Sequence, residues 1–145
     1  MAKKGKLIIV RGLPYSGKTS WTREQCGKNP NCIRVSWTDI LHSMSEKEYT
    51  LVITHCALFA AACLAKEALS KGMTVYLDEE NLFAPGISIF CRDAEQVGAS
   101  IEFHLVKCSP EKAKQNCLER GGSSAVLEKI DHLATEYAEL LELKR

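Results

Sequence analysis

The sequence predicts a three-layer α/β fold, in which helices cover both faces of a parallel sheet of about four to five strands. Apolar runs of strand length alternate along the chain with longer segments of helical period, which is the pattern of strands joined by crossover helices. The chain has 145 residues, and the 46% that are hydrophobic suffice for one sizeable core. We therefore expect a single domain over residues 1–145.

Four short apolar runs are expected to form the strands, with helices between and after them. The runs cover residues 6–10, 33–37, 73–77 and 101–106. The longer helices are expected over residues 46–71, 85–97, 110–120 and 124–143. Ser109 and Pro110 suit an N-cap and a first helical residue. The segment 46–71 is rich in Ala and Leu, which predicts a packed helix.

A phosphate-binding loop is predicted by residues 11–21, RGLPYSGKTSW, which contain G-x-x-x-x-G-K-[ST] directly after the first expected strand. In such a P-loop, backbone N–H groups bind phosphates at the positive end of the following helix. We expect Lys18 to contact the β- and γ-phosphates and the Thr19 hydroxyl to bind Mg²⁺. The expected nucleotide-binding residues are Gly12, Leu13, Pro14, Tyr15, Ser16, Gly17, Lys18, Thr19 and Ser20. The sequence thus predicts a P-loop NTPase fold with ATP and Mg²⁺ as cofactors.

Trp21 lies just past the P-loop, in the helix that follows it. An aromatic residue at this position is expected to pack the helix against the sheet. Stacking on a nucleotide base is the alternative.

Acidic residues follow the third expected strand as Asp78-Glu79-Glu80. Ligands of open parallel sheets bind outside the carboxyl ends of the strands. P-loop proteins place the carboxylate that orients Mg²⁺ at this point of the chain. Asp78 is the first choice as metal ligand and Glu79 the second. The alternative is that the three acids form a solvated turn.

The turn after the second strand offers Asp39 and His42, which would share one face of a short helix beginning at Thr38 or Asp39. A carboxylate here can accept the proton of an attacking hydroxyl, so Asp39 is a catalytic candidate. The competing interpretation is that Thr38 and Asp39 only cap the helix.

Arg120 precedes Gly121 and Gly122 at the end of the helix expected to start at Pro110. An arginine beside paired glycines suits a lid that closes over the phosphates and stabilises charge in the transition state. An ordinary helix C-terminus is the alternative, because cations and glycine are both common there.

With these motifs in place, the chain resembles the kinase domain of the bacteriophage-type 5'-hydroxyl polynucleotide kinases, within the small P-loop nucleoside and polynucleotide kinases. The similarity runs nearly end to end. It includes G-x-P-x-S-G-K-[ST]-x-W, Asn29-Pro30, the acidic turn after the second strand, Asp78 to Asn81 with Leu82, and Arg120-Gly121. The resemblance implies transfer of the γ-phosphoryl group of a nucleoside triphosphate to a hydroxyl. It implies that Lys18 and Thr19 bind the phosphates and the metal. It also implies that an acidic residue after the second strand acts as the base and that the lid arginine, Arg120, binds the phosphates.

The acceptor side departs from the family pattern N-R-D-D-x-R, in which the first Asp is the base and the last Arg holds a phosphate of the acceptor. An alignment without gaps places Thr38 at the position of the family's base and Leu41 at the position of its last arginine. A one-residue insertion near Asn31 instead places Asp39 and His42 there. We favour the insertion, because it keeps an acid and a cationic partner at the family spacing. Thr38 and His42 are the candidate acceptor-binding residues.

Three hypotheses of function follow. The first is an ATP-dependent kinase of a polynucleotide 5'-hydroxyl or of another nucleic-acid hydroxyl, such as one on a modified base. The second changes the acceptor to a nucleoside or another small hydroxylated molecule, which suits the altered acceptor side. The third is a module that binds ATP without transferring its phosphate.

The predicted lid also departs from the family pattern. This chain has Gln115 where the family tends to carry a second arginine, so Arg120 is the lid arginine that remains.

The composition limits the partners. The 19 Lys and Arg residues against 18 Asp and Glu give a net charge of +1, which provides no broad positive field for holding long nucleic acid, so any contact with nucleic acid should be local. Seven cysteines without a C-x-x-C pair are typical of buried thiols in a reducing cytoplasm. The start of the chain lacks a long apolar segment, so we expect a cytoplasmic protein without membrane contact. The sequence leaves the oligomeric state open.

Overall fold

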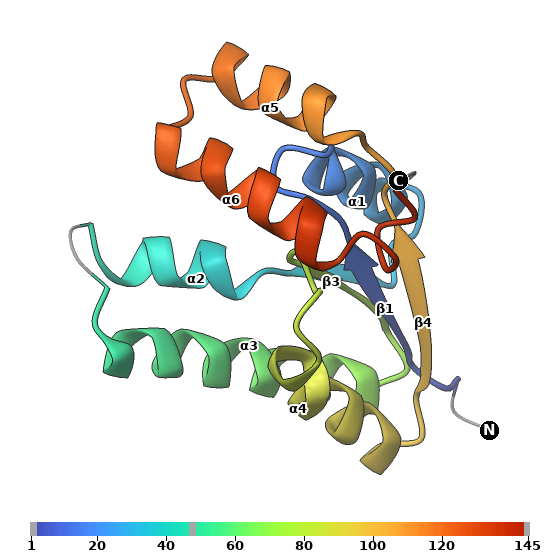
Figure 1. Ribbon diagram of the computed structural model, residues 1–145. Helices are drawn as coiled ribbons and strands as arrows, with labels where there is room; N and C mark the ends of the chain where they lie inside the picture. The colour runs from blue at the N-terminus through green and yellow to red at the C-terminus, as the bar shows by residue number, and fades with distance from the viewer. Residues whose placement is uncertain (1–2, 47–48, 144–145) are drawn as a thin grey trace.

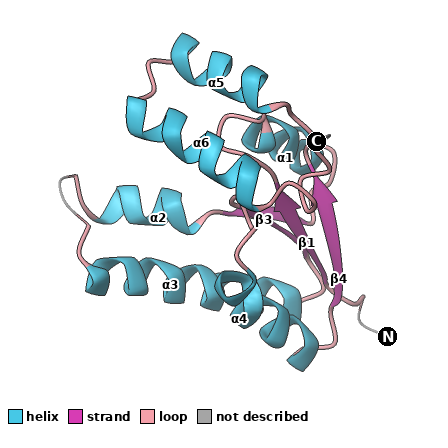
Figure 2. Ribbon diagram, in the orientation of Figure 1, coloured by secondary structure: helices cyan, strands magenta, loops and turns pink. Residues whose placement is uncertain are grey.

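The computed structural model describes residues 3–46 and 49–143. Within these residues, four strands form one parallel sheet in the order β2-β3-β1-β4 (Figures 1 and 2). The strands are β1 Lys6–Arg11, β2 Cys32–Val35, β3 Thr74–Asp78 and β4 Ser100–Leu105. Because all neighbours pair in parallel, the carboxyl ends of the strands meet at one edge of the sheet. The predicted α/β fold with a parallel sheet is confirmed.

The main core lies on one face of the sheet, under α3 Leu51–Ser70 and α4 Ala84–Gln96. Strand side chains alternate between the faces, and every second residue points into this core. The strand residues buried there include Leu7, Ile9, Val75 and Leu77. Burial of these apolar side chains stabilises the stack of sheet and helices.

The opposite face is covered by α1 Lys18–Gly27. Here Trp21 stacks on His104 of β4 with ring centroids 3.8 Å apart, and it meets Tyr76 of β3 edge-on at 5.7 Å. The expectation that Trp21 packs its helix against the sheet is confirmed. Helices on both faces give the three expected layers.

A second, smaller core lies beyond the carboxyl edge of the sheet. It joins α5 Pro110–Glu119 to α6 Ser124–Glu136, which lie above the arrowheads of β1 and β4 in Figure 1. Leu13 from the loop after β1 and Leu82 from the loop after β3 are buried in this core. The α5–α6 pair is therefore anchored to two of the loops that carry candidate site residues, those after β1 and β3.

The second strand ends earlier than the apolar run 33–37 predicts. It stops at Val35, because the Ser36 side chain accepts a hydrogen bond from the Asp39 backbone N–H and so begins α2 Trp37–Met44. The N-cap is thus Ser36 rather than Thr38 or Asp39. Asp39 falls in the first turn of α2, where a carboxylate also interacts favourably with the helix dipole.

α3 begins at Leu51, later than the expected start at residue 46, because the Thr50 side chain caps it. Its small residues Ala57, Ala61 and Ala65 are buried. Its outer face leaves apolar side chains exposed, namely Leu51, Val52, Phe59 and Leu64. Among the described residues, α3 alone has the length and the apolar composition that crossing a membrane would require. The prediction of a packed helix is right for the inner face and wrong for the outer one.

The last helix ends at Glu136 instead of continuing to residue 143. Beyond it the chain forms turns, in which Leu141 N–H donates to the Tyr137 carbonyl at 3.0 Å and Leu143 N–H to the Ala138 carbonyl at 3.0 Å. The turns place Leu141 in the small core at 4% exposure. The apolar residues after Glu136 predicted a longer helix, but they have this spacing because the turns bury Leu141 in the small core.

Candidate active site

The loop between β1 and α1 has a backbone that suits phosphate binding. Gly17 has a φ of +98° and is the N-cap of α1, with no side chain capping the helix. The N–H groups of the first helical turn thus lie at the loop. A Cβ on Gly12 would stand 3.0 Å from the Val106 carbonyl oxygen, which is closer than most Cβ contacts, so a side chain there would crowd the backbone. The positive φ of Gly17 and the close approach at Gly12 both favour glycine at these two positions of the motif.

Lys18 lies at the centre of the loop with 8% of its surface exposed. Its Nζ donates to the carbonyl oxygens of Gly12 at 3.0 Å and Leu13 at 2.6 Å. Burial lowers the pKa of Lys18, while the carboxylates of residues 78–80 oppose this shift by attracting the charged form. The structure thus places one ammonium group inside the loop, where P-loops bind the oxygens of the β- and γ-phosphates.

Most of the other expected nucleotide-binding residues line one cavity together with Lys18. Leu13 is buried in the small core behind the loop, and the Ser16 hydroxyl is buried without a hydrogen-bond partner among the described residues. A cavity of about 220 Å³, here called the lid cavity, is lined by Pro14, Tyr15, Gly17, Lys18, Thr19, Ser20 and Arg120. The loop and the lid arginine therefore face one space.

Thr19 joins the start of α1 to the end of β3. Its Oγ1 donates to Asp78 Oδ2 at 2.8 Å, and the Asp78 side chain is 3% exposed. Hydroxyl and carboxylate oxygens are the hard donors that Mg²⁺ prefers, and it commonly takes one or two such protein ligands beside phosphate oxygens and water. The chemistry and closeness of this pair fit a magnesium ion at the P-loop.

Arg34 in β2 connects the two acidic candidates, and sequence reasoning missed it. Its Nε donates to Asp78 Oδ2 at 2.7 Å, and its Nη1 donates to Asp39 Oδ2 at 2.6 Å. Burial disfavours the charged guanidinium, but the hydrogen bonds and charges of Asp39 and Asp78 outweigh it and raise the pKa of Arg34. The available signal was a lone charged residue within the apolar run 33–37.

Glu79 fixes the start of α2. Its Oε1 accepts hydrogen bonds from Ser36 Oγ and the Thr38 N–H, both at 3.0 Å, and its Oε2 accepts from Thr38 Oγ1 at 2.7 Å. Burial raises the pKa of Glu79, and these hydrogen bonds oppose the shift. Because Asp78 and Glu79 are both buried, the alternative of a solvated turn is wrong for them.

A second cavity, here called the acid cavity, lies beside the lid cavity. It has about 200 Å³ and is lined by residues that include Lys18, Thr19, Arg34, Thr38, Asp39 and residues 78–80. Lys18 and Thr19 line both cavities. The P-loop thus stands between the lid arginine on one side and the exposed carboxylate of Asp39 on the other.

Arg120 has the backbone of an ordinary helix end. It is the C-cap of α5, and Gly121 follows with a φ of +72°. The Arg120 side chain also lines the lid cavity, which brings it to the P-loop residues. The helix end is therefore confirmed, and the role of Arg120 in a lid stays a prediction.

His42 lies apart from the residues that gather around Asp39. Its ring stacks on that of Tyr49 with centroids 5.7 Å apart, and it lines neither of the two cavities. Thr38 does line the acid cavity, but its hydroxyl donates to Glu79. The structure therefore brings Arg34, rather than His42, to Asp39 as the cationic partner.

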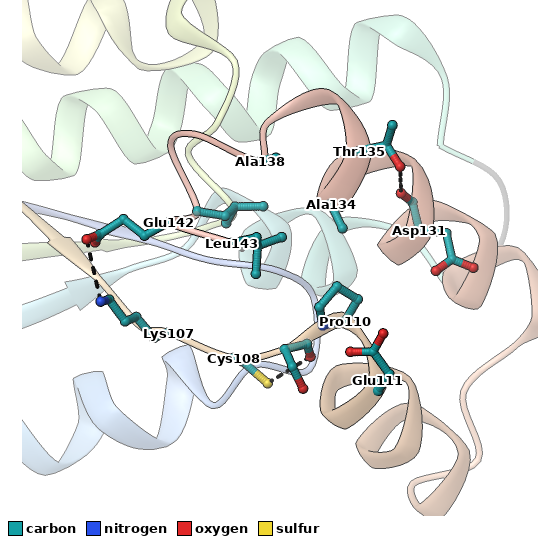
Figure 3. Close-up of a pocket in the computed structure, with 12 residues that line it drawn as sticks. Lys107, Cys108, Pro110, Glu111, Asp131, Ala134, Thr135, Ala138, Glu142 and Leu143 are labelled. Atoms are coloured by element: carbon teal, nitrogen blue, oxygen red, sulfur yellow. Dashed lines mark hydrogen bonds and ion pairs between the residues drawn. The ribbon is translucent and has the colours of Figure 1, made fainter. Parts of the chain in front are cut away.

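A larger cavity, of about 800 Å³, lies elsewhere, between the residues after β4, the start of α5 and the end of α6 (Figure 3). Lys107 and Glu142 form an ion pair at 3.5 Å across it. No residue that the sequence predicts for the site lines this cavity, and its lysine charge is balanced by Glu142. We therefore place the candidate active site at the lid and acid cavities.

Comparisons with known proteins agree with this architecture. A chain of the Pnkp1/Rnl/Hen1 RNA repair complex has a TM-score of 0.79 and 19% identity over 99% of the present chain. The match covers 48% of that chain, so the present sequence spans about half of its length.

Two further structures have the same fold. A protein named as a kinase, from Chloroflexus aurantiacus j-10-fl, has a TM-score of 0.73 and 17% identity, covering 88% of this chain and 75% of its own. The APS kinase CysC of Mycobacterium tuberculosis, solved in complex with AMPPNP and APS, has a TM-score of 0.60 and 11% identity, covering 79% and 69% of the two chains. At these identities the likeness establishes the fold.

A family model described as AAA domain (AAA_33) matches residues 7–140, which is most of the chain. The match includes the P-loop, the acids after β3 and the lid arginine. The chain therefore belongs to the AAA domain family AAA_33 and has the fold of the P-loop kinases.

Proposed function

We propose that the protein is a Mg²⁺-dependent kinase that transfers the γ-phosphoryl group of ATP to a hydroxyl group. One observation carries this proposal. The acid cavity gathers Lys18, the Thr19–Asp78 pair and the carboxylate of Asp39 around one space. These are the parts that phosphoryl transfer needs, namely charge on the phosphates, ligands for the metal and a proton acceptor.

The donor side consists of the P-loop and the end of β3. Backbone N–H groups of the loop and the Lys18 ammonium hold the phosphates of ATP. Thr19 and Asp78 would hold Mg²⁺, which supplies charge neutralisation between the β- and γ-phosphates. Because Lys18 and the Thr19–Asp78 pair line one cavity, the group that would contact the phosphates lies beside the residues that would hold the metal.

Asp39 is the proton acceptor in this proposal. Its side chain is 54% exposed at the acid cavity, and the Arg34 guanidinium orients it. Thr38 is the competing candidate from the sequence, but a threonine hydroxyl is a poor base near neutral pH, and here it already donates to Glu79. These observations favour Asp39 over Thr38.

Arg120 completes the site from the lid side. Transition-state charge spreads over the equatorial oxygens of the transferred phosphoryl group, and a guanidinium beside it stabilises that charge. Arg120 stands at the end of α5, whose core is separate from the main core, so movement of the α5–α6 pair would bring it to the phosphates.

The acceptor belongs to the nucleic acids or their components in this proposal. The sequence resemblance implies a polynucleotide 5'-hydroxyl, and the chain of the RNA repair complex has the same fold. A nucleoside or another small hydroxylated molecule is the alternative acceptor. Seven free cysteines and the use of ATP are consistent with a cytoplasmic protein.

A non-catalytic ATP-binding module is the second candidate function. The observation that favours it is Arg34, which engages both Asp78 and Asp39 and so occupies oxygens that metal and acceptor would use. In this alternative the arginine is a permanent part of the fold.

Replacing Asp39 with Asn separates the two functions. A kinase loses roughly 10²- to 10⁴-fold in turnover, with its ATP affinity retained, because the proton acceptor is lost and the donor side is intact. Asp131→Asn is the matched control, since Asp131 is 59% exposed and pairs with Lys114 at 2.9 Å. Turnover of Asp39→Asn equal to that of the control would contradict the role of Asp39.

A further inference from the structure

A third cavity, here called the ring pocket, adjoins the acid cavity. It has about 220 Å³, and both cavities are lined by Glu79 and Glu80. Three aromatic side chains line it, from Trp37 at the start of α2, Phe83 before α4 and Tyr137 after α6. A molecule in the ring pocket would therefore lie next to the space where Asp39 stands.

The ring pocket lies between the two cores of the protein. Trp37 packs against the main core under the sheet, whereas Tyr137 packs against the small core of α5 and α6. Figure 1 shows α6 lying across from α2 and the start of α4, on the side of the carboxyl ends of the strands. Because Lys129 of α6 also pairs with Glu80 at 3.5 Å, the α5–α6 pair contributes both an aromatic wall and a polar rim.

The lining of the ring pocket indicates a planar, largely apolar occupant. Beside the aromatic residues, Leu82 and Ile87 are buried in its wall. Aromatic side chains bind bases by stacking with little regard to sequence, because every base has a π-face. The volume lies below the range of about 300–1,000 Å³ for drug-sized ligands, so it suits one ring system.

The charges around the two connected cavities indicate an acceptor without a phosphate near its hydroxyl. Apart from Lys18 of the P-loop, the described cations that line them are Arg34 and Lys129. Arg34 is paired with two carboxylates and Lys129 with Glu80. A phosphate beside the acceptor hydroxyl would meet an excess of carboxylates here, which repel it.

From these contacts we infer that the ring pocket binds the aromatic ring of the acceptor, and that the acceptor is an uncharged, nucleoside-like molecule carrying a hydroxyl group. The inference rests on the proposed function and specifies the class of molecule that accepts the phosphoryl group. During transfer, the acceptor oxygen gives its proton to Asp39 and bonds to the γ-phosphorus, while the bond from that phosphorus to the bridging oxygen breaks and ADP leaves.

Gly86 offers a way to fill the ring pocket without touching the residues assigned to catalysis. It lies in the first turn of α4 and lines the pocket, and a Cβ there would meet only Phe83 Cδ1, at 3.8 Å. Gly86→Trp therefore blocks the pocket. Gly27→Trp is the matched control, because Gly27 ends α1 and a Cβ there meets nothing within 4 Å.

Phe83→Ala is a second test, since it removes one aromatic wall of the ring pocket. Phe83 is 63% exposed, so its ring can be removed without opening a core.

The first measurement is binding of adenosine, guanosine, cytidine and uridine to the protein with ADP and Mg²⁺ bound, observed by saturation-transfer NMR of the ring protons. At least one nucleoside should bind the unmodified protein. Its affinity should fall roughly tenfold or more in Gly86→Trp and Phe83→Ala and stay unchanged in Gly27→Trp. Affinity for ADP should be the same in all four proteins. Equal nucleoside binding to Gly86→Trp would overturn the inference.

The second measurement is transfer of labelled γ-phosphate from ATP to the same nucleosides, to 5'-hydroxyl oligonucleotides and to a polyol without a ring. Label on nucleosides, with KM raised roughly tenfold in Gly86→Trp, is the expected result. Label on oligonucleotides or on the polyol, with none on nucleosides, overturns the inference and leaves the kinase function standing. Binding of nucleosides that depends on Gly86, with no transfer to any acceptor, supports the ring pocket and contradicts the kinase function.

Discussion

Arg34 donates its Nε to the buried carboxylate of Asp78 at 2.7 Å, and so ties the second strand to the end of the third. The other end of the same guanidinium holds Asp39 at 2.6 Å. One side chain thus sets the position of both the candidate metal ligand and the candidate base. Its removal should affect the fold as well as the chemistry.

Arg34→Ala should lower the free energy of unfolding by about 2 kcal/mol, because it leaves the 3%-exposed Asp78 carboxylate without its cationic partner. Denaturant unfolding measures this loss. Arg92→Ala on the exposed surface of α4 serves as control and should change stability by less than about 0.5 kcal/mol. Equal stability of the two variants would show that the pair contributes nothing to folding.

Asp78→Asn should raise the Mg²⁺ concentration needed for half-maximal ATP binding by roughly 10- to 100-fold, because an amide replaces the carboxylate beside Thr19. Calorimetric titration of ATP at several Mg²⁺ concentrations measures the shift. Asp93→Asn controls for loss of a largely buried carboxylate, since Asp93 is 15% exposed and pairs with Lys66 at 4.0 Å. An unchanged Mg²⁺ requirement in Asp78→Asn would remove Asp78 from the metal site.

Trp21→Ala should cost about 2 kcal/mol of stability, because the indole packs α1 on His104 and Tyr76. Trp21→Phe keeps an aromatic ring and should cost less. Neither variant should lose affinity for ATP beyond what its lower stability explains. A loss of ATP affinity in a fully folded Trp21→Phe protein would support the alternative, in which Trp21 stacks on a base.

The cysteines should react with iodoacetamide in an order set by exposure and by their pKa. Cys56 and Cys63 are exposed on α3 and should react first. Burial and a hydrogen bond with Cys26 raise the pKa of Cys32 to about 12. Because the thiolate is the reactive form, the alkylation rate of Cys32 should keep rising as the pH is raised from 8 to 11. Mass spectrometry of timed reactions measures both effects, and fast labelling of Cys32 at pH 8 would contradict the burial of its thiol.

The sequence was enough to predict the sheet and the P-loop, because both depend on local patterns. Apolar runs identify strands. The glycines of the loop can be recognised in the sequence because the backbone conformation at Gly17 and the close contacts at Gly12 favour glycine. Helix ends were less predictable, since side-chain caps at Ser36 and Thr50 decided them.

The acceptor side could not be predicted in the same way, because it depends on which strands are neighbours. Only the pairing of β2 with β3 brings Arg34 to Asp78, and the α/β pattern alone does not determine this order. The placement of His42 on Tyr49 likewise depends on how α2 meets the start of α3. Asp39 and His42 lie three residues apart in α2, as the spacing predicted, but the Asp39 carboxylate pairs with Arg34 whereas the His42 ring stacks on Tyr49.

Transfer of the γ-phosphoryl group of ATP to a hydroxyl is measured most directly as labelled phosphate that appears on nucleosides or on 5'-hydroxyl oligonucleotides in the presence of Mg²⁺. We expect label on one of these acceptors with the unmodified protein and none with Lys18→Ala, which lacks the ammonium at the centre of the P-loop. No label on any acceptor from a protein that still binds ATP would contradict the kinase function and favour an ATP-binding module.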